Sequence, residues 1–122
     1  MDNPKNRLKQ ALLKNQRQIG LWSTWSSNYT VEVLAGAGFD WLVLDTEHSP
    51  ADLENLLGQL QVVAAYPTTA VIRVPWNDMV NIKRVLDLGA QSLLIPQINT
   101  AAEAKNAVAY TRFPPAGLRG VA

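Results

Sequence analysis

The stretch Trp41–Pro50, WLVLDTEHSP, is an apolar run that ends in Asp45, Glu47 and His48, the only histidine of the chain. The apolar part predicts a buried strand over residues 40–45, because strands covered on both faces are almost continuously apolar. Charged groups at the end of such a strand have to be paired, hydrated or bound to a metal. In parallel α/β sheets and barrels, this end of the strand is where chemistry takes place.

Short apolar segments alternate with amphipathic ones on both sides of this stretch. Strands are predicted over residues 18–23, 40–45, 69–74 and 91–98. Five helices are predicted. The first covers residues 3–15 and is opened by Asn3 and Pro4, and the second follows a cap at Ser27 or Asn28. The third follows Ser49 and Pro50, the fourth runs from about residue 77 to Gly89, and the fifth follows a cap at Asn99. The alternation predicts a parallel α/β sheet. Its four β/α units fit either a small doubly wound sheet or half of an eight-stranded barrel.

Helical periodicity predicts which side chains of each helix face the core. The predicted inward residues are Leu8 and Leu12; Leu53, Leu56, Leu57, Leu60 and Val63; Met79, Ile82 and Leu86; and Ala101, Ala104 and Val108. No G-x-G-x-x-G or phosphate-binding loop follows any predicted strand, so a nucleotide-binding sheet is disfavoured.

Composition restricts the possible partners. The chain has 122 residues, no cysteine and a formal net charge of +1, which gives no broad electrostatic case for nucleic acid or membrane binding. No apolar run approaches the ~20 residues of a membrane span. Five basic residues lie among the first seventeen, where we expect a solvated helix face, with a nucleic-acid arm as the alternative. The absence of cysteine excludes disulfides and thiolate metal sites and fits a cytoplasmic protein.

Polar residues stand at the end of every predicted strand. In chain order they are Trp22, Ser23 and Thr24; Asp45, Glu47 and His48; Arg73, followed by Trp76 and Asn77; and Gln97. If the strands are parallel and adjacent, all of these residues face one mouth of the sheet.

Each of these residues has a chemical interpretation and a simpler one. His48 is a candidate general base with Asp45 orienting its ring, or it is a loop histidine beside a helix-capping aspartate. Glu47 either holds a water near a metal or is a solvated acid. Arg73 either clamps a substrate carboxylate or enolate oxygen, or forms an internal salt bridge to Asp45 or Glu47. Trp22 either walls the pocket or serves in packing.

Lysine is absent from the predicted strands, since all five lysines lie on helices or at their edges. A Schiff-base mechanism needs a lysine at the mouth. The available acid, base and cation suit metal-assisted enolate chemistry instead.

Five stretches together resemble the HpcH/HpaI family of metal-dependent class II pyruvate aldolases. They are QIGLW, LAGAGFDWLVLDTEHSP, VIRVPWND, IKRVLDLGAQSLLIPQI and RFPPAGLRGV. The resemblance implies a (β/α)8 barrel that reversibly cleaves 4-hydroxy-2-oxo acids to pyruvate and an aldehyde. It implies that His48 with Asp45 is the acid/base and that Arg73 supports the enolate. Trp22 and Gln97, from their positions at the predicted strand ends, are expected to bind the substrate together with Arg73. The resemblance also implies a divalent metal, Mg2+, Mn2+ or Co2+.

The resemblance covers about half of a family barrel. Residues 1–122 are therefore expected to be one partial barrel domain, an N-terminal helix plus four β/α units. The Glu and Asp that bind the metal in the family lie on later strands, so Glu47 would reach the metal only through water. A fragment or truncated chain is favoured over two associating half-barrels, and unpaired sheet edges predict homo-oligomers or aggregation. The alternative functions are an oxaloacetate decarboxylase-type lyase and a non-catalytic half-barrel that binds or complements a partner chain.

Overall fold

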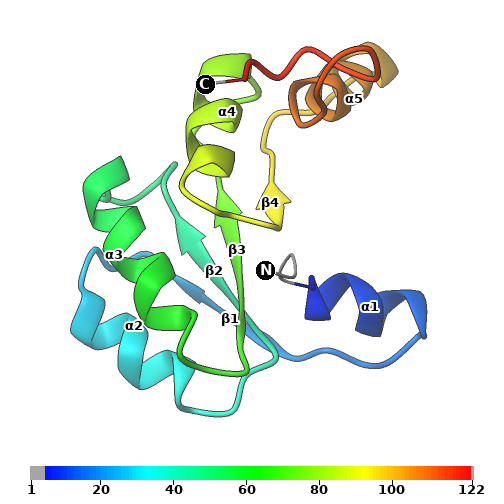
Figure 1. Cartoon of the computed structure of the whole chain (residues 1–122). Helices are drawn as coiled ribbons and strands as arrows, with labels where there is room; N and C mark the ends of the chain where they lie inside the picture. Colours follow the sequence, from blue (N-terminus) through cyan, green and yellow to red (C-terminus); the bar gives the residue numbers. More distant parts are fainter. Residues whose placement is uncertain (1–4, 122) are drawn as a thin grey trace.

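The computed structural model describes residues 5–121, in which strands and helices alternate along the chain (Figure 1). The elements are α1 (Arg7–Leu13), β1 (Gly20–Ser23), α2 (Asn28–Ala35), β2 (Trp41–Asp45), α3 (Leu53–Val63), β3 (Thr69–Arg73), α4 (Met79–Asp87), β4 (Leu93–Leu94) and α5 (Ala101–Tyr110). Among these residues, no helix is long and apolar enough to cross a membrane.

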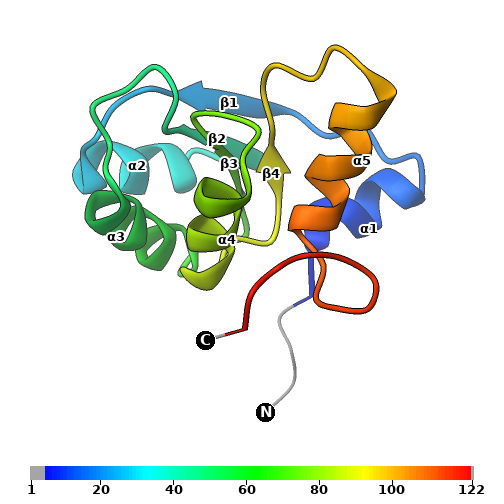
Figure 2. The ribbon, with the colours of Figure 1, turned by 90° about the horizontal axis from the view of Figure 1, so that it is seen from above.

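The four strands form one parallel sheet in the order β1-β2-β3-β4. Figures 1 and 2 show α2, α3 and α4 together on one side of this sheet. A doubly wound sheet reverses its strand order and carries helices on both faces, whereas a barrel adds each strand beside the last and keeps its helices outside. The doubly wound alternative is therefore wrong, and the predicted half-barrel architecture is confirmed.

The core lies between the sheet and these helices. Leu42 and Leu44 of β2 and Ile72 of β3 are buried against Val31 of α2 and Leu56 of α3. Because side chains alternate across a strand, the residues between them point to the opposite face, which is the inner face of the half-barrel. The fold thus uses one face of each strand for packing and leaves the other for the site.

The helix starts are set by side chains that reach the first free backbone N–H groups. Ser27 caps α2 as predicted, and Asp52 caps α3, three residues after Ser49. The predicted cap of α5 was wrong by one residue: Thr100 accepts from the Glu103 N–H, and the Glu103 side chain closes a capping box. The first helix is shorter than predicted, and its cap is Asn6. Asn3 and Pro4 lie outside the described residues.

Several predicted inward faces were wrong. Met79 is 41% exposed and Leu12 is 56% exposed, and α1 has no buried residue. On α5, Ala107 is the buried residue, whereas Val108 is 49% exposed and Ala101 and Ala104 are also exposed. Leu57 is 37% exposed at the edge of the α3 stripe. These errors concentrate in the first and last helices, because the sheet that each would cover is short or absent beneath it.

The fourth strand is much shorter than the predicted 91–98. Only Leu93 and Leu94 pair with β3. Pro96 has no N–H to donate to a ladder, and Gln97 has a φ of 59°, in the left-handed region that ends an extended chain. Both features end the strand at Leu94, level with Arg73, so Gln97 lies beyond the strand.

Candidate active site

The carboxyl ends of β1, β2 and β3 bring Trp22, Asp45 and Arg73 together on the inner face of the sheet. Asp45 and Arg73 are the last paired residues of β2 and β3, and Trp22 pairs with Val43. Strand alternation puts Val43 and Asp45 on one face, so Trp22, Asp45 and Arg73 share that face. The convergence predicted from the strand ends is thus present for the first three strands.

The guanidinium of Arg73 is held from three directions. Its Nε donates to Asp45 Oδ1 at 3.0 Å, and its Nη2 donates to Asp45 Oδ2, which completes a two-pronged ion pair. Its Nη1 lies 3.0 Å from Glu47 Oε2. The Trp22 ring stacks on it, with 4.7 Å from Arg73 Cζ to the ring centroid. The internal salt bridge that the sequence left open is therefore formed, and it involves both acids.

The carboxylate of Asp45 is buried and fully engaged. Only 3% of the residue is exposed. Besides Arg73, Asp45 Oδ1 accepts from the backbone N–H groups of Glu47 at 2.9 Å and His48 at 3.1 Å, and Asp45 Oδ2 accepts from Trp22 Nε1 at 3.1 Å. This arrangement fixes the turn that follows β2 as well as the arginine.

Charge and hydrogen bonding oppose burial in setting the ionisation of this pair. Burial alone would raise the pKa of Asp45, but the bonds from Arg73, Trp22, His48 and Glu47 outweigh it and hold this pKa well below its ordinary value. The hydrogen bond to Asp45 raises the pKa of Arg73; burial opposes this, and the negative charges of Asp45 and Glu47 add to it. The ion pair is thus charged at all ordinary pH values.

The imidazole of His48 is not placed as expected. Asp45 was predicted to orient the ring, but it binds the backbone N–H of His48, and the ring Nε2 lies 3.6 Å from Glu47 Oε1. The His48 side chain is 73% exposed. The reason is competition, since Arg73, Trp22 and two backbone N–H groups already occupy both oxygens of Asp45. The geometry matches the alternative interpretation of His48 as a loop residue.

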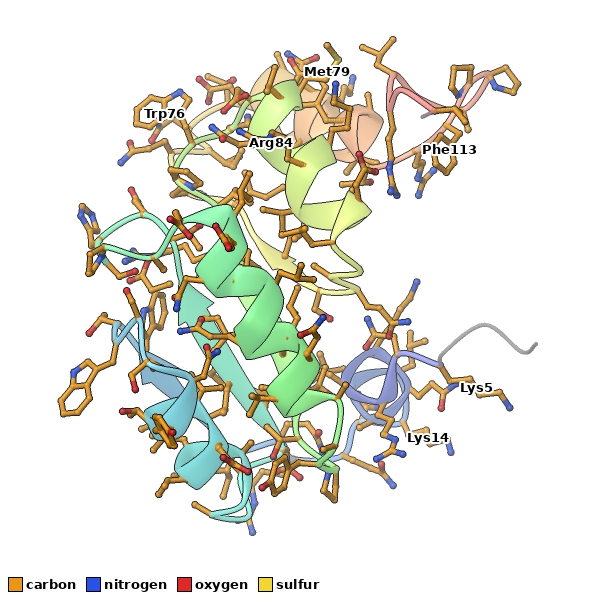
Figure 3. The ribbon with its side chains drawn as sticks, turned by 60° about the vertical axis from the view of Figure 1, so that its left-hand side comes forward. Lys5, Lys14, Trp76, Met79, Arg84 and Phe113 are labelled. Carbon is orange, nitrogen blue, oxygen red and sulfur yellow. The ribbon has the colours of Figure 1, made fainter. Side chains whose placement is uncertain are left out.

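Two other residues expected near the mouth, Gln97 and Trp76, form no hydrogen bond with this cluster in the described part of the chain. Within residues 5–121, exposed Gln97 makes no hydrogen bond or ion pair with Asp45, Glu47 or Arg73. Trp76, in the β3–α4 loop, is 55% exposed and stands at the other end of the molecule from Lys5 and Lys14 (Figure 3). The basic N-terminal segment is therefore remote from this loop.

Sequence reasoning missed two hydroxyl residues in the site. The Thr46 hydroxyl donates to the backbone oxygen of Arg73 at 2.6 Å, and the Ser49 hydroxyl donates to the backbone oxygen of Asp45. A local signal existed, because serine and threonine next to a strand end commonly bond to nearby backbone groups. Ser23 is also buried, at 5% exposed, and its hydroxyl has no partner.

The donor set of this cluster does not suit a metal by itself. In the described part of the chain, no group of three or more histidine, aspartate or glutamate side chains is placed to hold a metal ion. Asp45 is saturated by five donors, and Glu47 faces Arg73 and His48. What the cluster does offer is a fixed cation whose remaining N–H groups can bind an anionic oxygen.

Comparison with known proteins identifies the family of this chain. Residues 18–122 match the family described as HpcH/HpaI aldolase/citrate lyase. The chain belongs to the HpcH/HpaI aldolase/citrate lyase family. The family predicted from the sequence is confirmed, and with it the expectation that the match covers only part of a family member.

The family relatives include a protein named 4-hydroxy-2-oxo-heptane-1,7-dioate aldolase from Salmonella dublin. It is 56% identical over 117 residues, which are 96% of this chain and 44% of that protein. A HpcH/HpaI aldolase/citrate lyase family protein from Burkholderia cenocepacia J2315 superposes with a TM-score of 0.90 at 44% identity, over 97% of this chain and 49% of that one. The HpcH/HpaI aldolase from Desulfitobacterium hafniense DCB-2 gives 0.85 at 27% identity, over 94% and 45%. The chain thus spans less than half the length of these HpcH/HpaI relatives.

Proposed function

We propose that the protein acts in a metal-dependent HpcH/HpaI aldolase that cleaves 4-hydroxy-2-oxo acids reversibly to pyruvate and an aldehyde. The observation that carries this proposal is the fixed guanidinium of Arg73 at the carboxyl ends of the strands. The homology to a protein named as such an aldolase supports the choice of substrate. We also infer that the partners are small molecules and that the protein is a cytoplasmic homo-oligomer; these two points stay predictions from the sequence.

The proposed role of Arg73 follows from its unused donors. A guanidinium has five N–H groups, and three of the Arg73 groups are engaged by Asp45 and Glu47. One N–H on Nη1 and one on Nη2 are left, and the side chain is 17% exposed. These two can bind the keto oxygen or the carboxylate of the pyruvate part. Because Asp45, Glu47 and Trp22 already hold the group, it needs no reorganisation when negative charge develops on the enolate.

His48 is proposed as the acid/base group of the reaction. In the cleavage direction, the proton of the 4-hydroxyl passes through a water to His48, and that oxygen becomes the aldehyde carbonyl. The C3–C4 bond breaks, its electron pair forms the enolate, and protonation at C3 then yields pyruvate. An imidazole suits both transfers because it has one nitrogen that can accept a proton and one that can donate a proton. Its exposed position lets it exchange protons with solvent between turnovers.

A divalent metal, Mg2+, Mn2+ or Co2+, is proposed as the cofactor of this aldolase. When bound, such an ion acts as a Lewis acid toward the keto oxygen. The described residues do not supply its ligand set, since they contain no suitable group of three. Glu47 is proposed to approach the metal through a water, and the ligands themselves would come from outside the residues described here.

Pyruvate release from a 4-hydroxy-2-oxo acid tests the proposal. The assay compares the 122-residue protein, alone and with the remaining half of a family barrel, in Mn2+, Mg2+ and EDTA. We expect metal-dependent release of pyruvate, and we expect His48→Ala to abolish it. Arg73→Lys should lower it strongly, because the single ammonium group of lysine cannot reproduce the several hydrogen bonds of the guanidinium. Arg119→Lys is the matched control, since Arg119 pairs with Asp87 on α4, outside the described site cluster. An unchanged kcat in His48→Ala would rule out its role.

The same assay separates the alternative functions. Oxaloacetate decarboxylation is favoured as a side reaction by any site that stabilises pyruvate enolate, and analysis of the products distinguishes it from aldol cleavage. A non-catalytic half-barrel is favoured by the lack of a metal-binding group among residues 5–121. No release under any condition, even with the complementing half added, would support that alternative and overturn the aldolase.

A further inference from the structure

Thr46 joins the end of β2 to the end of β3. It follows Asp45, the last paired residue of β2, and both its backbone N and its hydroxyl donate to the backbone oxygen of Arg73, at 3.0 and 2.6 Å. One carbonyl therefore accepts two hydrogen bonds from one residue. Only the first of these comes from the backbone and is independent of the side chain at position 46.

The peptide unit that follows Arg73 is held from both neighbouring strands. Its carbonyl is bound by Thr46 on the β2 side, and its N–H, which belongs to Val74, donates to Leu94 O at 3.2 Å on the β4 side. Leu94 is the last residue of β4. The orientation of this peptide constrains the direction of the Arg73 Cα–Cβ bond, which is the starting point from which the side chain reaches Asp45, Glu47 and Trp22.

We propose that Thr46 is a positioning residue: its hydroxyl fixes the Arg73 peptide and so keeps the guanidinium in the place where Asp45, Glu47 and Trp22 receive it. Both hydrogen bonds that Thr46 donates within the described residues go to the backbone oxygen of Arg73, so Thr46 acts through that residue. The structural part of the proposal stands by itself. Its catalytic consequence rests on the proposed function of Arg73.

Two variants isolate the hydroxyl. Thr46→Val keeps the branched shape and the backbone N–H but removes the hydroxyl, whereas Thr46→Ser keeps the hydroxyl. Thr68→Val is the matched control, because the buried Thr68 hydroxyl also bonds to backbone oxygens, those of Ala35 and Phe39, at 3.0 and 2.7 Å. Thr68 immediately precedes the start of β3, whereas Arg73 ends it. A general loss of stability should therefore appear in both Thr46→Val and Thr68→Val, whereas a loss of Arg73 positioning should appear only in Thr46→Val.

Side-chain hydrogen exchange provides a local measurement. The Arg73 Nε–H resonance is identified by its disappearance in Arg73→Lys, and its exchange rate is divided by that of the Ile72 backbone N–H, which is bonded to Ser92 O at 2.9 Å. We expect this ratio to rise about fivefold in Thr46→Val, the factor for one neutral hydrogen bond, and to stay within about twofold of wild type in Thr46→Ser and Thr68→Val. An unchanged ratio in Thr46→Val would overturn the proposal.

The kinetic measurement separates this proposal from the proposed function. In the assembled aldolase, kcat/KM for the 4-hydroxy-2-oxo acid should fall about fivefold in Thr46→Val and recover in Thr46→Ser. A changed exchange ratio with unchanged kcat/KM would support the positioning of Arg73 and contradict its catalytic role. A fall in kcat/KM of equal size in Thr68→Val would show a general stability effect and overturn the inference.

Discussion

Replacement of Asp45 by asparagine removes the buried negative charge that holds Arg73, and we expect it to lower the free energy of unfolding by about 3 kcal/mol. Asp45 is 3% exposed, and the Arg73 side chain is 17% exposed, so neither group is well hydrated. Breaking a buried pair by removing one partner costs about 3–5 kcal/mol. The lower end applies here because Glu47 still lies 3.0 Å from Arg73 Nη1.

Hydrogen-bond geometry adds to the loss of charge. Asparagine can still accept at one oxygen from the N–H groups of Glu47 and His48, as Asp45 Oδ1 does. Its amide NH2 would then replace Oδ2 and face two other donors, Arg73 Nη2 and Trp22 Nε1. A buried donor left without an acceptor carries a desolvation penalty of about 1–3 kcal/mol, which applies to Arg73 more than to Trp22, since Trp22 is 45% exposed. The substitution is therefore destabilising although it is nearly isosteric.

Urea unfolding followed by far-ultraviolet circular dichroism measures this loss. The control is Asp87→Asn, which breaks the pair with Arg119 at a side chain that is 44% exposed and should cost less than about 1 kcal/mol. If Asp45→Asn does not fold, Asp45→Asn combined with Arg73→Met should recover part of the stability, because no charge is then left unpaired. A loss below about 1 kcal/mol in Asp45→Asn would refute the reasoning.

Three further outcomes are expected. The pKa of Asp45 is lower in the folded chain than its unfolded value of about 3.9, so the unfolded chain binds more protons near that pH. The contribution of Asp45 to the free energy of unfolding is therefore present above about pH 4 and is lost on acidification. Urea midpoints measured against pH should fall in this way for the wild type and fall less for Asp45→Asn. Gly20→Ala should cost about 1–3 kcal/mol, because its Cβ would lie 2.0 Å from the Trp41 ring; an unchanged thermal midpoint would contradict this. Thr100→Ala should cost about 1 kcal/mol and speed hydrogen exchange at the Glu103 N–H, and equal exchange would show that the capping box is not formed.

The elements and the strand ends of the site were predictable because their signals are local in the chain. The apolar run before Asp45 predicted β2 to within one residue, and Arg73 was correctly expected at the end of its strand. The fourth strand was overestimated because periodicity was given more weight than Pro96, which removes a ladder donor. The prediction that Asp45 binds the His48 ring was also wrong, because a spacing of three residues does not show which oxygens of Asp45 remain available as acceptors.

The sequence by itself determined the alternation of strands and helices, and with it a parallel α/β sheet whose polar residues meet at the strand ends, because hydrophobic period is a property of neighbouring residues. The family was predicted from the resemblance of five stretches, and the strand order of the structure decided for the half-barrel over the doubly wound sheet. Only the tertiary structure decided that Asp45 binds Arg73, Trp22 and two backbone N–H groups, and that Glu47 is the acid next to the His48 ring. It also decided that the Thr46 hydroxyl binds the backbone oxygen of Arg73. The physical reason is that a buried carboxylate has few acceptor positions, and folding determines which of the donors brought to it occupy them.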